Sequence, residues 1–137
     1  MLFDADLLEH VRLISRSGRD HVSSDEDRIL RDLLLMHPEF DSLWNNPQVD
    51  PVRPQEIEGV TVNPFVHIAL HLIIGNQVRQ GSPAQVKKAY LHLVERGETD
   101  HDALHRIMGW YGKLYFESVR RSDSFDDARY VQGLSGL

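Results

Sequence analysis

The stretch that most constrains the fold is Asn63–Gln80, which predicts a single buried helix. Asn63 can cap this helix, and Pro64 suits its first turn, where a missing N–H costs nothing. Apolar side chains then lie on nearly every side: Phe65, Val66, Ile68, Ala69, Leu70, Leu72, Ile73, Ile74 and Val78. A helix that is apolar all round is normally buried, and this apolar run is too short to span a bilayer. We therefore expect the rest of the chain to pack around this helix.

Composition limits the partners that the chain can have. Its 21 acidic and 15 basic side chains give a formal net charge of −6, and basic residues never cluster beyond pairs such as Arg120–Arg121. Nucleic acids and anionic membranes both require a concentrated positive surface, so we expect neither as a partner. The 137 residues, 41% of them hydrophobic, predict one globular domain over residues 1–137.

Cysteine is absent from the chain. A disulfide framework, a thiolate nucleophile and a cysteine zinc site are thereby excluded. The amino-terminal residues MLFDADLLEH also lack the charged-then-apolar pattern of a secretory signal. We therefore expect a cytoplasmic protein.

Start and stop signals divide the remaining chain into further helices. Ser23–Glu26 has the form of a capping box, and Ser82–Gln85 combines a cap, a first-turn proline and a capping-box glutamine. Thr99 caps a longer helix that ends near Arg121, and Ser124 caps a final short helix. Apolar residues recur at helical spacing in each segment. The predicted fold class is all-α, a bundle of about five to six helices.

One long irregular loop is expected at about residues 45–62. Its turn-forming residues are Pro47, Pro51, Pro54 and Gly59. A short extended piece is expected at Val60–Val62, and no other segment shows strand alternation. Trp44 precedes the loop, and we expect it to anchor this segment in the core; the alternative is an exposed binding patch.

Two pairs of histidines are spaced four residues apart within predicted helices, His67–His71 and His101–His105. At this spacing both imidazoles of a pair lie on one helix face, about 6 Å apart along the axis. One helix intervenes between the two that carry the pairs, and short connections favour antiparallel neighbours. The two outer helices should therefore run parallel, with both pairs in their first turns. We predict that the four imidazoles approach one another at one end of the bundle.

Such a cluster has the chemistry of a transition-metal site. Burial and a nearby helix N-terminus both favour neutral imidazole, which is the form that a metal requires. Imidazole nitrogen prefers zinc, nickel, copper or iron to magnesium or calcium. The alternative is that these histidines hydrogen-bond carbonyl groups or each other within the core, as isolated buried histidines more often do.

Catalytic motifs are missing around both pairs. Neither pair has the glutamate that zincin-type motifs supply as general base. Glu98–His101 has the letters of the di-iron Glu-x-x-His motif, but Glu98 precedes the expected cap at Thr99. Glu117 lies about 18 Å along its helix from His105. No Gly-rich phosphate loop or Gly-x-Ser-x-Gly elbow occurs, so we assign no catalytic residue.

Several segments together resemble a bacterial family of small proteins, domain of unknown function 1841. They are His37-Pro38-Glu39-Phe40, then Asn63–Leu72 with Gln77-Val78, and His101-x-x-x-His105 with Met108 and Glu117. The resemblance covers most of the chain from about residue 28 and implies a helical cytoplasmic protein without a known activity. Asn76 and Leu104 stand where the family pattern leads us to expect glutamate, which makes catalysis a weaker expectation.

Three interpretations remain open, in this order. The first is an interaction or structural protein that binds another protein or itself, with the histidines serving packing. The second is a metal-binding bundle that uses His67, His71, His101 and His105. The third is a metal-dependent enzyme, which needs an open coordination position and a base that the sequence does not identify.

Overall fold

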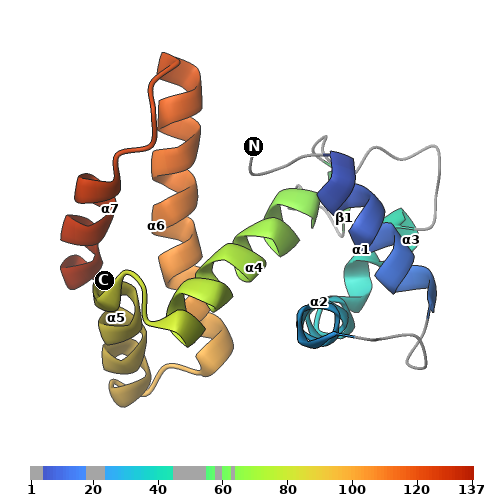
Figure 1. The fold of residues 1–137 in the computed structure, drawn as a ribbon, viewed down its shortest axis with the longest axis horizontal. Helices are drawn as coiled ribbons and strands as arrows, with labels where there is room; N and C mark the ends of the chain where they lie inside the picture. Colours follow the sequence, from blue (N-terminus) through green and yellow to red (C-terminus); the bar gives the residue numbers. More distant parts are fainter. Residues whose placement is uncertain (1–4, 18–23, 45–54, 58–59, 63) are drawn as a thin grey trace. The chain divides into compact units, whose positions relative to one another are not determined.

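A computed structural model describes residues 5–17, 24–44, 55–57, 60–62 and 64–137 (Figure 1). The predicted all-α class is confirmed, since helices make up nearly all of the described chain. The elements are α1 (Ala5–Ser17), α2 (Asp25–Leu35), the 3-10 turn η2 (Pro38–Phe40), α3 (Asp41–Trp44), β1 (Gln55–Ile57), β2 (Val60–Val62), α4 (Pro64–Gln80), α5 (Ala84–Glu95), α6 (Asp100–Arg121), α7 (Asp127–Gly133) and the 3-10 turn η3 (Leu134–Gly136). None of the described helices combines the length and apolar character that crossing a membrane requires.

The chain forms two compact units, Met1–Leu72 and Ile73–Leu137. The boundary falls inside α4, so each unit contains part of this helix. Only Asn76, Arg79 and Gln80 of α4 are exposed, in agreement with the apolar character of its sequence on all sides. Assignment of the whole chain to one domain stays a prediction.

The predicted helix caps can be compared with the observed ones. Ser24 accepts a hydrogen bond from the Asp27 N–H at 3.1 Å, and Thr99 caps α6 in the same way through the Asp102 N–H at 3.1 Å. The Thr99 cap was expected from the sequence, whereas the capping box predicted at Ser23–Glu26 begins one residue before the observed cap Ser24. Ser124 was the wrong choice for the last helix, because the Asp126 carboxylate accepts from the Arg129 N–H at 3.0 Å and caps α7. The cap predicted at Asn63 lies outside the described residues.

The segment expected to be an irregular loop contains a small β-ribbon. Strands β1 and β2 pair antiparallel, with Gln55 opposite Val62 and Ile57 opposite Val60. The extended piece at Val60–Val62 was expected, but its partner strand was not. Three-residue strands are too short to show an alternating pattern. The rest of the predicted loop, residues 45–54 and 58–59, lies outside the described residues.

The first unit is built around one apolar cluster. Trp44 is 0% exposed, and its ring meets that of Phe40 edge-on, with the ring centroids 6.3 Å apart. The predicted role of Trp44 as a core anchor is therefore confirmed, and the exposed-patch alternative is wrong. The cluster comprises Val11 and Ile14 of α1, Leu30 and Leu34 of α2, Phe40, Trp44, and Phe65 and Ile68 of α4.

The second unit packs α6 against α5 and α7 (Figure 1). Tyr130 of α7 is buried, and its hydroxyl donates to Gln77 Oε1 of α4 at 2.7 Å. Burial raises the pKa of the Tyr130 phenol well above its usual range, so the tyrosine is neutral at physiological pH. The Trp110 indole N–H donates to the Tyr130 carbonyl oxygen at 2.9 Å. These bonds tie α7 to both α4 and α6.

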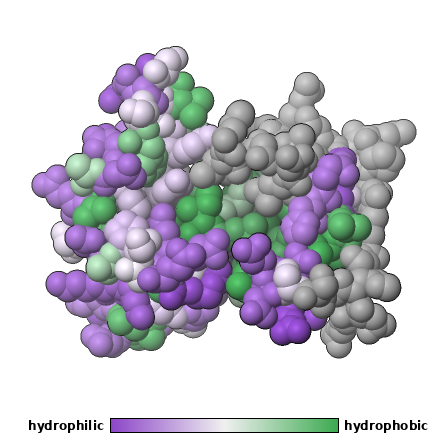
Figure 2. Space-filling model, viewed as in Figure 1, coloured by the Kyte–Doolittle hydropathy of each residue, from purple (hydrophilic) through white to green (hydrophobic). Residues whose placement is uncertain are grey.

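The exposed hydrophobic side chains of the second unit are scattered. On the face drawn in Figure 2, hydrophobic residues of α5, α6 and α7 form small areas separated by hydrophilic ones. The exposed large side chains in this unit are Leu91, Val94, Phe116 and Val119. This face therefore offers no broad apolar patch of the kind that marks partner sites.

We expect Gly133→Ala to destabilise the protein by about 1–3 kcal/mol, because a Cβ at this position would overlap the Trp110 indole. A matched control is Gly109→Ala in α6, where a Cβ would meet nothing within 4 Å. There the substitution should stabilise the helix by about 0.5–1 kcal/mol. Thermal or urea unfolding of both variants gives the comparison, and equal effects would contradict the packing assigned to α7.

Candidate metal centre

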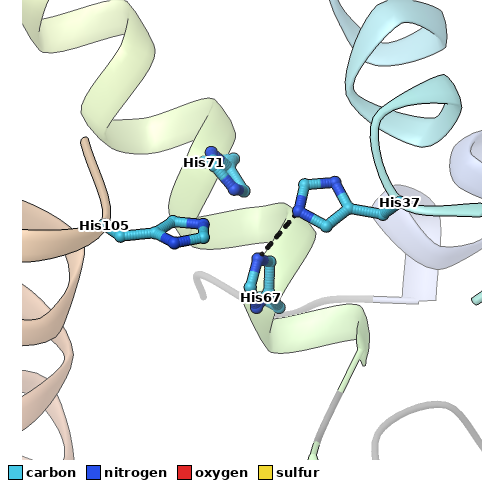
Figure 3. A group of neighbouring side chains, drawn as sticks. All are labelled: His37, His67, His71 and His105. Atoms are coloured by element: carbon cyan, nitrogen blue, oxygen red, sulfur yellow. Dashed lines mark hydrogen bonds between the residues drawn. The ribbon is translucent and has the colours of Figure 1, made fainter. Parts of the chain in front are cut away.

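Three histidines of the first unit converge on one point (Figure 3). One ring nitrogen from each of His37, His67 and His71 lies within 4.8 Å of those of the other two. The ring centroid of His37 lies 4.7 Å from that of His67 and 4.9 Å from that of His71. The ring centroids of His67 and His71 are 5.0 Å apart. Figure 3 also draws His105, which belongs to the second unit. The three imidazoles of the first unit form a candidate metal centre.

Two of these histidines come from the first turns of α4. His67 and His71 lie one helical turn apart, so their side chains leave the same face of the helix. Phe65 and Ile68 are fully buried in the core of the first unit and hold this part of α4 in place. His71 is only 2% exposed, whereas His67 is half-buried.

The third histidine, His37, follows the end of α2. Its Nδ1 lies 2.8 Å from the Leu33 carbonyl oxygen. A carbonyl oxygen can only accept, so Nδ1 carries a proton, and a ring with that single proton has its acceptor lone pair on Nε2. His67 Nε2 lies 3.1 Å from His37 Nε2 and therefore donates to it. The lone pair of His37 Nε2 thus points at His67 Nε2.

The aromatic ring of Phe40 packs against two of the three imidazoles. The Phe40 ring stacks on His37, with centroids 5.6 Å apart and an interplanar angle of 3°. The same ring meets His67 edge-on at 5.6 Å. Among the described residues, the group that could hold a metal consists of histidines alone. A donor set of neutral nitrogens suits zinc, copper, nickel or iron and is unsuited to magnesium or calcium.

The second predicted pair lies in the first two turns of α6. His101 and His105 are both half-buried, and their ring centroids are 4.0 Å apart. Each pair is therefore confirmed as one-turn neighbours on a single helix. The convergence of the two pairs, which belong to different units, stays a prediction.

Sequence reasoning missed His37 as a site residue. The step His37-Pro38 was interpreted only as the end of a helix, and nothing local relates it to a histidine thirty positions later. A signal was nonetheless present, because the His37–Phe40 segment was one of those that carried the family resemblance.

A family model described as Domain of unknown function (DUF1841) matches residues 12–135. The chain belongs to this family. The DUF1841 match includes the three histidines of the candidate centre and the α6 pair, and it confirms the resemblance found in the sequence. No curated protein and no solved structure matches the chain. Membership of DUF1841 supports the helical fold and names no reaction.

Proposed function

We propose that this protein binds a transition-metal ion through His37, His67 and His71, and that the ion has a structural role. One observation carries the proposal: three imidazoles with their nitrogens within 4.8 Å of one another, two of them almost fully buried. Polar groups that are buried together normally serve a ligand or a hydrogen-bond network.

The spacing of two donors fits an ion. Two imidazole nitrogens bound tetrahedrally to zinc at about 2.0–2.1 Å lie about 3.3–3.4 Å from each other. The Nε2 atoms of His37 and His67 are 3.1 Å apart. An ion could therefore replace the hydrogen bond with little change in the distance between the two nitrogens, once the rings tilt to aim both lone pairs at it.

For the fourth donor of a tetrahedral site we propose the His101–His105 pair, on the sequence argument alone. The predicted set of His67, His71, His101 and His105 is thereby revised to include His37. Four imidazoles would close the coordination shell, as in structural zinc sites, whereas an open position would be needed for catalysis. Among the described residues, the group at this site consists of histidines without a carboxylate that could act as general base, so the structural role is favoured over an enzyme.

The test is elemental analysis of protein purified without a histidine tag, followed by zinc titration of the metal-free form. We expect about one transition-metal ion per chain and a higher melting temperature with zinc but not with magnesium. Binding should weaken below about pH 6, because a protonated imidazole has no lone pair to offer. Protein that holds no metal and whose melting temperature does not respond to zinc, nickel, copper or iron would refute the proposal.

A further inference from the structure

At the end of α2 the His37 N–H bonds three residues back instead of the four of a regular α-helix, and we attribute this change to Pro38. Proline has no N–H, so the Leu34 carbonyl lacks the donor that residue 38 would supply in a continuing helix. The His37 N–H bonds to the Leu34 oxygen instead, at 3.2 Å. The Leu33 carbonyl, the regular helical acceptor for that N–H, is left open and accepts from His37 Nδ1.

Pro38 also restricts the backbone before it. Residues that precede proline avoid the helical region, and His37 has φ −127° and ψ 59°. This conformation takes the chain out of α2 and lets the imidazole fold back onto the last turn of the helix. The Phe40 ring, two residues after Pro38, then stacks on the His37 ring. Both contacts fix the direction in which His37 Nε2 points.

We infer that Pro38 is a positioning residue of the metal centre: by freeing the Leu33 carbonyl, it holds His37 in the Nδ1–H tautomer with Nε2 as a preformed donor. The role of Pro38 at the metal rests on the proposed function, whereas its effect on the tautomer does not. A carbonyl that accepts from the distal nitrogen of a ligating histidine fixes the tautomer and orientation of the ring. Here the proline that ends α2 makes the Leu33 carbonyl available as that acceptor.

A continuing helix would remove this arrangement. With alanine at position 38, its N–H can bond to the Leu34 oxygen, and the His37 N–H can return to the Leu33 oxygen. His37 Nδ1 then shares the Leu33 oxygen with the His37 N–H, and a helical backbone at His37 no longer directs the ring onto that oxygen. Pro38 is itself exposed, so the substitution removes little packing. The effect on the site should therefore act through the backbone.

The first measurement uses the metal-free full-length protein. Long-range ¹H–¹⁵N correlation spectra, recorded above the histidine titration range, report which ring nitrogen carries the proton. We expect His37 of the wild type to be protonated at Nδ1 and Pro38→Ala to shift the population toward Nε2–H. An Nε2–H tautomer in the wild type, or an unchanged tautomer in Pro38→Ala, would overturn the inference.

The second measurement compares zinc affinities. Pro38→Ala should bind zinc about 10–100-fold more weakly with every histidine still present. Pro38→Gly, which disfavours a continuing helix, should lose less affinity than Pro38→Ala although glycine makes the chain more flexible. Glu39→Ala, at the exposed neighbouring position, should leave the affinity unchanged.

The two arms separate the possible failures. A merely structural role for Pro38 predicts either equal zinc affinities for the two variants or a weaker affinity for Pro38→Gly than for Pro38→Ala, and either result would refute the inference. If Pro38→Ala does not fold, Pro38→Gly must show a smaller tautomer shift in the same direction, and no shift would refute it. If the wild type binds no zinc, the proposed function fails, and the tautomer spectra still decide the effect of Pro38.

Discussion

The double variant His37→Ala/His71→Ala should lose zinc binding almost completely. A structural zinc site contributes about 10–16 kcal/mol through four ligands, so losing two should cost about 5 kcal/mol or more, over a thousandfold in affinity. The rise in melting temperature that zinc gives the wild type should disappear with it. Isothermal titration and thermal unfolding with and without zinc measure both effects.

Matched variants make this result specific. His92→Ala replaces an exposed histidine of α5 and should bind zinc like the wild type. Single substitutions of His101 and His105 then test the proposed fourth donor. An unaffected affinity in both would leave a three-histidine site, and retention of tight binding by the His37/His71 double variant would exclude the site altogether.

Leu30→Ala should destabilise the protein by about 2–5 kcal/mol, since Leu30 is 2% exposed within the core of the first unit. The cost combines lost burial with the cavity that alanine leaves. Leu35→Ala on the same helix is the control, because Leu35 is 57% exposed. Its change in unfolding free energy should stay within about 0.5 kcal/mol. Urea unfolding of the two variants gives both values, and similar losses would mean that the burial of α2 has been misassigned.

The helices could be predicted from the sequence because their signals are local. Thr99 was identified as a cap from its own residue type, and the capping box expected at Ser23–Glu26 lies within one residue of the observed cap Ser24. Trp44 was assigned to the core because its neighbours Phe40 and Leu43 continue an apolar face. In each case the physical cause lies within one or two turns of the residue that it affects.

The candidate site could be predicted only in part, because its members come from distant segments. His67 and His71 could be identified because they are spaced one helical turn apart. His37 has no such partner nearby, and its proximity to His67 depends on how α2 and α4 pack in the first unit. The same limit applied to the β-ribbon, in which the pairing of Gln55 with Val62 leaves no periodic trace in three residues.

Helix α4 runs through the boundary between Leu72 and Ile73, and this has a consequence for how the chain acquires its structure. Cutting the backbone at that point would leave two helical pieces of roughly two turns each. Helices shorter than about 12–15 residues are marginally stable in water, because the few hydrogen bonds that they form do not offset the unfavourable free energy of helix nucleation. Each piece would depend on its own unit for stability, while the intact helix gains from both. The two units should therefore unfold in a shared transition rather than as independent modules.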